Sequence, residues 1–235
     1  MSFGSTKDYF GLATAGEIEL QTDNSNPSYA TDASAEDSNG DMVCTTKSGE
    51  TREVSSSYRF CGGGDTNNQH NLDTHVEIGM VKSFDTGTHY QVTNIQLGTD
   101  NKGYPLLTVT GIQDTGVTAQ THALYSTSLT FLAKKKAQGF GLGTLAAGDK
   151  VISGSVTISG NITPVADSVG NIVKREPYGV KISATNSLQN CTADPSTPVD
   201  TASGWGEETP AAALAESNTD YSTATVAAFK NVTQD

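Results

Sequence analysis

The histidines are the first residues in this 235-residue sequence whose side chains could do chemistry. The segment HNLDTH places His70 and His75 five residues apart, with Asp73 between them and Cys61 upstream. Imidazole, carboxylate and thiolate groups are zinc ligands, but a structural zinc site is typically built from tighter pairs, such as two cysteines separated by two residues. The spacing therefore predicts no metal site, and we expect these histidines to lie at the surface or at strand ends.

Two glycine-rich segments lack the spacing of catalytic loops. A serine nucleophile needs a strained G-x-S-x-G turn with acid and base partners, whereas SGSVTISG lies within one alternating run. A phosphate-binding loop needs wider glycine spacing and a following Lys-Ser or Lys-Thr pair, and GFGLGTLAAGDK, with its glycines at 139, 141 and 143, has neither. We therefore predict no catalytic, cofactor-binding or metal-binding residue, and a protein that is not an enzyme.

The charge balance argues against a conventional nucleic-acid-binding protein. The chain has 26 acidic and 14 basic residues and a net charge of −12, and an acidic protein repels the phosphate backbone. The only basic run, Lys134–Lys136, is expected to be a solvated strand end or to meet an acidic patch on another copy, for instance residues 23–41. No apolar run is long enough to span a membrane, and the first residues lack the features of a signal peptide, which predicts maturation in a cytoplasm.

The clearest structural signal is the segment Lys150–Val165, KVISGSVTISGNITPV, in which apolar and hydroxyl residues alternate. Side chains of a strand point alternately to its two faces, so one face is apolar and the other carries hydroxyl and amide groups. At about 3.3 Å per residue the alternating run spans about 40 Å, twice the length of an ordinary strand. We expect one set to be buried and the other to face solvent or another subunit: Ile152, Val156, Ile158 and Ile162 against Ser153, Ser155, Thr157 and Ser159.

Shorter alternating runs, separated by turn sequences such as SNGD and TDNKGYP, predict further strands. These are Glu17–Thr22, Met42–Lys47, Val54–Cys61, His75–Val81, Tyr90–Leu97, Leu106–Ile112, Leu124–Leu132, Val180–Thr185 and Thr223–Phe229. Many short strands with hardly any helical periodicity between them are typical of an antiparallel sandwich or barrel. The predicted fold class is therefore all-β, an antiparallel β-sandwich or barrel with one short helix and extended loops and arms.

Two segments before the second strand are expected to extend from this fold. Residues 1–15 are predicted to form an arm with aromatic anchors at Phe3, Tyr9 and Phe10. Residues 23–41 are nearly all small or acidic and cannot bury enough apolar surface to fold alone, so we predict a long acidic loop. We expect this loop to be mobile in an isolated monomer and ordered by contact with another copy.

One helix is predicted near the end of the chain, over Glu207–Ser217. Thr209 is a suitable N-cap, Pro210 fits the first helical position, and alanines follow. The segment is short and weakly apolar, so it needs tertiary contacts to persist. No fixed repeat or sharp change of composition divides the chain, and residues 1–235 are predicted to form a single domain.

An arm, a long acidic loop, many strands, one small helix and a closing strand together resemble the major tail tube proteins of long-tailed, non-contractile bacteriophages. Three stretches carry the resemblance: ASAEDSNGDMV (33–43), YQVTNIQLGTDNKGYPLLTVTGI (90–112) and SVTISGNITPVADSVGNIVKREPYGVKISAT (155–185). The resemblance covers most of the chain as a pattern of strands and turns rather than as a diagnostic motif.

The resemblance implies a β-sandwich subunit whose copies form hexameric rings. Sheets of neighbouring copies join into a continuous inner barrel, and rings stack through extended loops and terminal arms. The partners are then other copies of the chain, a tape-measure protein in the lumen, and tail terminator or tip proteins. DNA passes through the lumen only as cargo at ejection, and we expect a net negative lumen wall that gives DNA no cationic foothold. The expected location is the virion tail, assembled in the host cytoplasm.

Other functions share this composition and strand count. A capsid decoration protein or a head–tail connector component is another kind of virion protein, and a β-sandwich module of a receptor-binding fibre is a binding protein. A sugar-binding module usually presents exposed aromatic residues, whereas Trp205 is the only tryptophan, and a single tryptophan more often packs or fills an interface. A tube subunit is distinguished by forming open-ended cylinders, whereas a decoration protein binds only assembled capsids.

Overall fold

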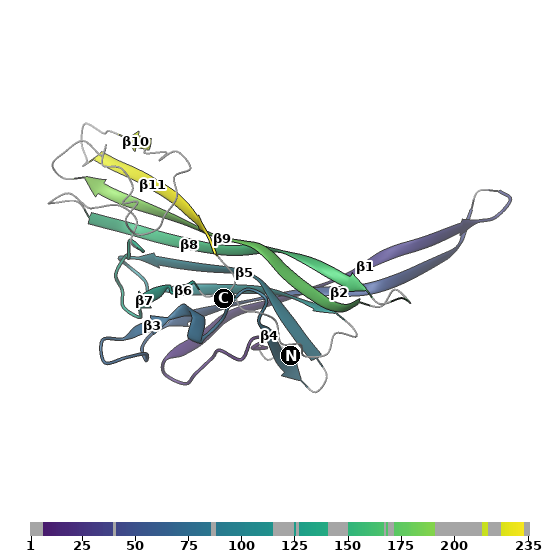
Figure 1. Cartoon of the computed structure of the whole chain (residues 1–235), viewed down its shortest axis with the longest axis horizontal. Helices are drawn as coiled ribbons and strands as arrows, with labels where there is room; N and C mark the ends of the chain where they lie inside the picture. The colour runs from purple at the N-terminus through teal and green to yellow at the C-terminus, as the bar shows by residue number, and fades with distance from the viewer. Residues whose placement is uncertain are drawn as a thin grey trace, which may run out of the picture.

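The chain folds into long strands joined by turns (Figure 1). The computed structural model describes residues 7–39, 41–85, 88–114, 125, 127–140, 150–166, 168, 172–190, 213–215 and 222–232. The strands are β1 (Ile18–Glu36), β2 (Met42–Phe60), β3 (Gln69–Asn71), β4 (Val81–Asp85), β5 (Thr88–Asp100), β6 (Leu106–Asp114), β7 (Thr130–Leu132), β8 (Lys150–Ala166), β9 (Ile172–Asn190), β10 (Ala213–Ala215) and β11 (Ser222–Asn231). The one helical element among these residues is a 3₁₀ turn, η1 (Leu72–Thr74).

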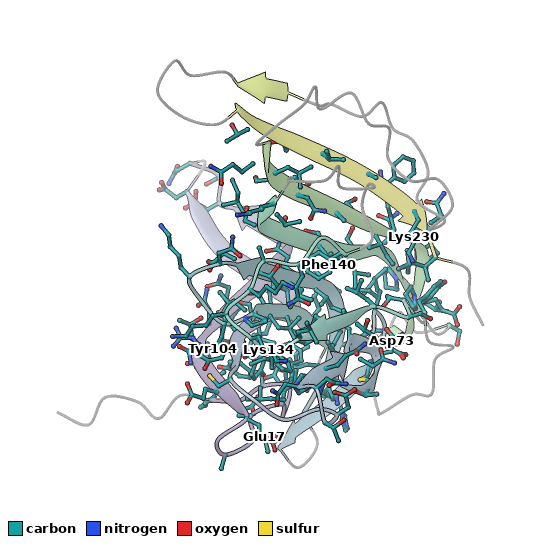
Figure 2. The ribbon with its side chains drawn as sticks, turned by 90° about the vertical axis from the view of Figure 1, so that its left-hand side faces the viewer. Glu17, Asp73, Tyr104, Lys134, Phe140 and Lys230 are labelled. Atoms are coloured by element: carbon teal, nitrogen blue, oxygen red, sulfur yellow. The ribbon has the colours of Figure 1, made fainter. Side chains whose placement is uncertain are left out.

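The strands form a nine-stranded sheet and a small second sheet. The order in the large sheet is β1-β2-β6-β5-β8-β9-β11-β10, with β4 beside the first part of β5, and β3 pairs with β7 in the second sheet. All of these pairs are antiparallel. The large sheet curves around a core to which η1, β7 and the N-terminal segment also contribute (Figure 2). The predicted all-β antiparallel class is therefore confirmed.

Strand register separates an apolar row from a polar row on the two faces of the large sheet. One row crosses five strands and is buried: Tyr58, Leu107, Leu97, Val156 and Ala184. The adjacent row points to the other face: Ser57, Thr108, Gln96, Thr157 and Ser183. Burying one large aliphatic side chain contributes about 1.5–3 kcal/mol. A slip of one residue would exchange the two faces, so the apolar rows hold the register.

The long alternating segment is strand β8, and the predicted facing is confirmed in its middle. Val156 and Ile158 are each 1 % exposed, whereas Ser155 and Ser159 are exposed. Elsewhere the contrast is weaker: Thr157, between the two buried residues, is half-buried, and so are Ile152, Ser153 and Ile162 toward the ends. The reason at the ends is that β8 has 17 residues but lies against β5 only over residues 153–159, and bulges interrupt its pairing with β9 at both ends of that stretch.

The N-terminal segment is anchored in the core. Tyr9 and Phe10 are 7 % and 2 % exposed, as predicted; Phe3 lies outside the described residues. Asp8 organises the segment, because its carboxylate accepts hydrogen bonds from the N–H groups of Gly11 and Ala13, both at 2.8 Å, and from the hydroxyl of Tyr58. Burial, and then the hydrogen bond to Asp8, raises the pKa of Tyr58. Tyr58 therefore stays protonated and acts as a donor that ties the segment to the sheet.

The predicted helix at Glu207–Ser217 is wrong where the structure describes it. Ala213–Ala215 forms strand β10 and pairs with Thr223–Thr225 at the edge of β11. The other positions of that prediction lie outside the described residues. A helix of this length is marginal in water, whereas the edge of β11 offers backbone hydrogen-bond partners to these three residues.

The predicted strand His75–Val81 is also wrong, although its apolar residues are buried. Val76 and Ile78 are 1 % and 0 % exposed, but they lie in the irregular segment between η1 and β4. Gly79 has a φ of +85°, a conformation that glycine adopts readily and a side chain disfavours. This residue breaks the extended run, so the strand begins only at Val81.

The predicted strand Leu124–Leu132 is correct only at its end, because β7 covers Thr130–Leu132. Before it, Asp73 accepts hydrogen bonds from the backbone N–H groups of Thr127 at 3.0 Å and Ser128 at 2.7 Å. Ser128 has a φ of +52°. These local side-chain bonds offer the backbone an alternative to sheet pairing and turn the chain. Leu124 itself lies outside the described residues.

Candidate functional site: assembly surfaces

The β1–β2 hairpin extends far beyond the rest of the sheet (Figure 1). The two strands pair along their whole length, ending with Glu36 opposite Met42. β6 covers β2 only over Thr51–Arg59, so residues 30–48, called the ribbon below, have no third strand beside them in the described chain. An isolated two-stranded hairpin is at best marginally stable in water. Contact with a partner would therefore stabilise the ribbon.

The predicted acidic loop at residues 23–41 is wrong in its secondary structure, because β1 continues to Glu36 and only a short turn follows. Asp37 holds this turn: its Oδ1 accepts hydrogen bonds from the N–H groups of Asn39 at 2.8 Å and Asp41 at 3.0 Å. The small and acidic residues lack a core to pack on, but they do not prevent strand pairing. The signal that could have revealed the hairpin is the Asn-Gly dipeptide beginning at Asn39, which is typical of tight hairpin turns.

The face of the large sheet that points away from the core is rich in hydroxyl and amide groups. The Oγ of Ser57 and the Oγ1 of Thr108 lie 2.9 Å apart on neighbouring strands. The charged side chains that the register places on this face are few and include Glu19, Glu53, Asp100, Arg59, Lys150 and Lys181. With three carboxylates and three cations in this set, the face is close to neutral even though the chain carries a net charge of −12. A strong excess of carboxylates is not found on this part of the described sheet.

The two outer edges of the large sheet differ in how far they are covered. No strand of the described chain lies beyond β1. At the other edge β10 covers only Thr223–Thr225 of β11, and within the described residues Val226–Phe229 have β9 as their one strand neighbour. Open strand edges are templates for pairing with another chain. The sheet therefore offers one edge on each side to neighbouring molecules.

His70 and His75 meet among aromatic side chains beside a cleft of about 470 Å³. His70 is 4 % exposed and stacks on Phe131 with ring centroids 5.5 Å apart, while Phe60 packs edge-on against both imidazoles. The prediction of a surface position is therefore wrong for His70. No sequence motif marks the pair, because the contact depends on the η1 turn between the two residues.

Hydrogen bonds fix the tautomer of His70. Its Nε2 lies 3.0 Å from the Gly62 carbonyl oxygen, which can only accept, so this nitrogen carries the proton. Nδ1 of His70 then accepts a hydrogen bond from Nε2 of His75 at 3.1 Å. Burial, followed by the nearby His70 and Lys82, lowers the pKa of His75 to about 4, so His75 is neutral at pH 7. Within the described residues no three His, Cys, Asp or Glu side chains gather so as to hold a metal ion.

The lysine run Lys134–Lys136 forms an exposed turn after β7. The Nζ of Lys135 lies 5.1 Å from the centroid of the Tyr104 ring, within cation–π range. Lys102, also exposed, belongs to the same β5–β6 turn as Tyr104. The predicted solvated position is confirmed for the single chain, and a contact of these lysines with another copy stays a prediction.

Comparison with known proteins adds no relative: no protein-family model matches the chain, and no curated protein matches it. Among the described residues there is no helix with the length and apolar character needed to cross a membrane.

Proposed function

We propose that this chain is a virion structural protein, the major tail tube subunit of a long-tailed, non-contractile phage. Copies join side by side into rings, hexameric in the proposal, and the rings stack into a conduit for DNA. The observation that carries the proposal is the ribbon, residues 30–48, whose backbone pairing extends beyond any third strand of the described chain. Such an element gains stability from contact with another molecule, and in a homopolymer that molecule is another copy.

The sheet edges support the side-by-side contacts of a ring. β1 lies at one edge, and the incompletely covered β11 lies at the other. Pairing of one edge with the opposite edge of a neighbour satisfies backbone groups of both strands. The contact is head-to-tail, and head-to-tail contacts close into a ring when the rotation between copies permits it.

The near-neutral hydroxyl face suits the wall of a DNA conduit. Its few cations, Arg59, Lys150 and Lys181, are matched in number by nearby carboxylates, so a duplex gains little from counterion release on this surface. DNA is then transiting cargo, while the tape-measure protein and the terminator or tip proteins are the lasting partners in the proposal. No chemical step is required of the chain, and its place is the virion tail, assembled in the host cytoplasm.

A variant without the ribbon tests the proposal. Ala30 and Ser48 lie opposite each other, so residues 31–47 can be replaced by an Asn-Gly turn without disturbing the strands below. We expect the full chain to sediment as rings or longer assemblies and the variant to sediment as smaller species with an unchanged far-ultraviolet circular dichroism band. Long assemblies of the variant, equal to those of the full chain, would contradict the role given to the ribbon. A full chain that associates only with assembled capsids would favour a decoration protein.

A further inference from the structure

The tip of the ribbon and the lysine run lie at opposite ends of the molecule. Strand β2 connects the two ends: its first residue, Met42, adjoins the tip, and at its last residue the N–H of Phe60 donates to the carbonyl oxygen of Pro105 at 3.0 Å. The strand has 19 residues, which at about 3.3 Å each separates its ends by about 60 Å. Figure 1 shows the ribbon leaving the right-hand end, and Figure 2 views the other end, where Tyr104 and Lys134 lie close together.

Hydrogen bonds hold the lysine run against the β5–β6 turn. The N–H of Ala137 donates to Oδ1 of Asn101, and the N–H of Gln138 donates to Oγ1 of Thr99, both at 3.0 Å. The cation–π contact of Lys135 with Tyr104 adds a side-chain link. Four exposed ammonium groups are therefore held on one fixed surface, which we call the lysine pole: Lys102, Lys134, Lys135 and Lys136.

Two acidic residues near the lysine pole, Asp65 and Asp100, are engaged in their own turns. Oδ1 of Asp100 accepts hydrogen bonds from the N–H groups of Lys102 and Gly103, and Oδ1 of Asp65 accepts them from two further backbone N–H groups at 2.7 and 2.9 Å. These bonds lower the pKa of both carboxyls. The positive ends of the N–H dipoles offset part of each carboxylate charge, which leaves the ammonium groups to dominate the contact surface.

The ribbon tip has the opposite charge. The ribbon, residues 30–48, contains four acids, Asp32, Glu36, Asp37 and Asp41, against one lysine, Lys47, and three of the acids lie at residues 36–41, next to the turn. The side chains of Asp37 and Asp41 are exposed, and the hydrogen bonds that Asp37 accepts fix the shape of the turn. An acidic tip at one end of the chain and a basic surface at the other form a complementary pair between two copies, because the separation prevents contact within one copy.

We propose that the ribbon tip of one copy docks on the lysine pole of another copy, so that copies add end to end. The proposal rests on the proposed tube function and names the contact that stacks one ring on the next. Complementary charge of this kind steers and registers a contact and suppresses wrong partners.

Charge reversal tests the pairing. The pole variant is K134E/K135E/K136E, and the tip variant is E36K/D41K, which keeps Asp37 and its turn. The control E17K/E53K changes two exposed carboxylates outside the tip by the same total charge. Self-association is measured by sedimentation velocity and negative-stain electron microscopy in 0.1 M and 1 M NaCl. These salts change the Debye length from about 10 to about 3 Å.

We expect association of the unmodified chain to weaken by about tenfold at the higher salt, and each reversal to abolish end-to-end growth in 0.1 M NaCl. The control should grow normally. A 1:1 mixture of pole and tip variants, and a chain carrying both reversals, should regain growth, which misfolded variants cannot do. Failure of both rescues, or tubes unaffected by either reversal, overturns the pairing and leaves the tube function standing. A chain that stays monomeric overturns both proposals. If the unmodified chain binds duplex DNA and the pole variant does not, the lysine pole is a nucleic-acid site instead.

Discussion

The β8–β9 and β1–β2 hairpins have strands of similar length but different surroundings. β8 has 17 residues and β9 has 19, and the middle of this hairpin lies between β5 and β11 with Val156 and Ile158 buried beneath it. β1 and β2 have 19 residues each, yet from residue 30 outward they pair only with each other in the described chain. The middle of the β8–β9 hairpin packs on the core, whereas the outer part of the β1–β2 hairpin extends beyond the core.

The two hairpins differ in the source of their stability. The β8–β9 middle is stabilised within the chain, because apolar rows on neighbouring strands cover one another. The ribbon has paired backbone but no such rows beneath it, so we expect another copy to supply its stability. Substitutions in the middle of β8 should therefore change the stability of the monomer, and changes in the ribbon should change assembly.

The largest effect is expected at Ile158. Replacing it with alanine leaves a cavity at a site that is 1 % exposed, and we expect the free energy of unfolding to fall by about 2–5 kcal/mol. Thr157→Ala, on the other face of the same strand, should cost about 0.5 kcal/mol or less. Urea unfolding followed by circular dichroism measures both variants. Equal losses would show that the two faces of β8 are misassigned.

A smaller loss is expected from Tyr58→Phe. The hydroxyl of Tyr58 donates to the Asp8 carboxylate and ties the N-terminal segment to β2. Removing a buried hydrogen bond to a charged acceptor costs about 1–3 kcal/mol. Tyr178→Phe is a matched control, because the Tyr178 side chain is 52 % exposed and should be replaceable without effect. Chemical denaturation measures the free energy of unfolding of both variants. If Tyr178→Phe lowers this free energy as much as Tyr58→Phe does, the explanation is refuted.

The histidine pair should make the free energy of unfolding decrease as the pH falls. The pKa of His75 is lowered from 6.5 to about 4, so the unfolded chain binds the extra proton first as pH falls. The stability that neutral His75 gives the folded state is fully present above pH 6.5 and is lost progressively as the pH falls toward 4. Because the ring is half-exposed, solvent screening reduces the effect to about 1–2 kcal/mol. His75→Gln should flatten the dependence of unfolding free energy on pH between 6.5 and 5, and an unchanged slope would contradict the prediction.

The smallest effect on monomer stability is expected from shortening the ribbon. Replacing residues 31–47 with an Asn-Gly turn removes pairing that no core supports, so the free energy of unfolding should change by about 1 kcal/mol or less. Thermal and urea unfolding of the shortened chain at low concentration measure this change. A loss of several kcal/mol would mean that the ribbon belongs to the cooperative unit of the monomer.

Contact with the core also decided which strands the sequence could predict. Alternation predicted β8, the last part of β2 and the centres of β5, β6, β9 and β11, because one face of each of these segments meets the core and carries apolar residues. In the ribbon, the strand predicted at Met42–Lys47 is part of β2, but residues 30–36 of β1 escaped prediction, because they meet no core and their small and acidic residues resembled a loop. The strand predicted at His75–Val81 failed for the opposite reason, since Val76 and Ile78 are buried from a turn that Gly79 permits. The pairing of His70 with His75 depends on that irregular backbone, and spacing carries no signal for it.

The measurement that most directly tests the proposed function is electron microscopy of the purified full chain, negatively stained, at a series of concentrations. A tail tube subunit should form rings of uniform diameter that stack into open-ended tubes, with length increasing as concentration rises. Particles that remain single subunits at every concentration, or closed assemblies without a lumen, would contradict the proposed function.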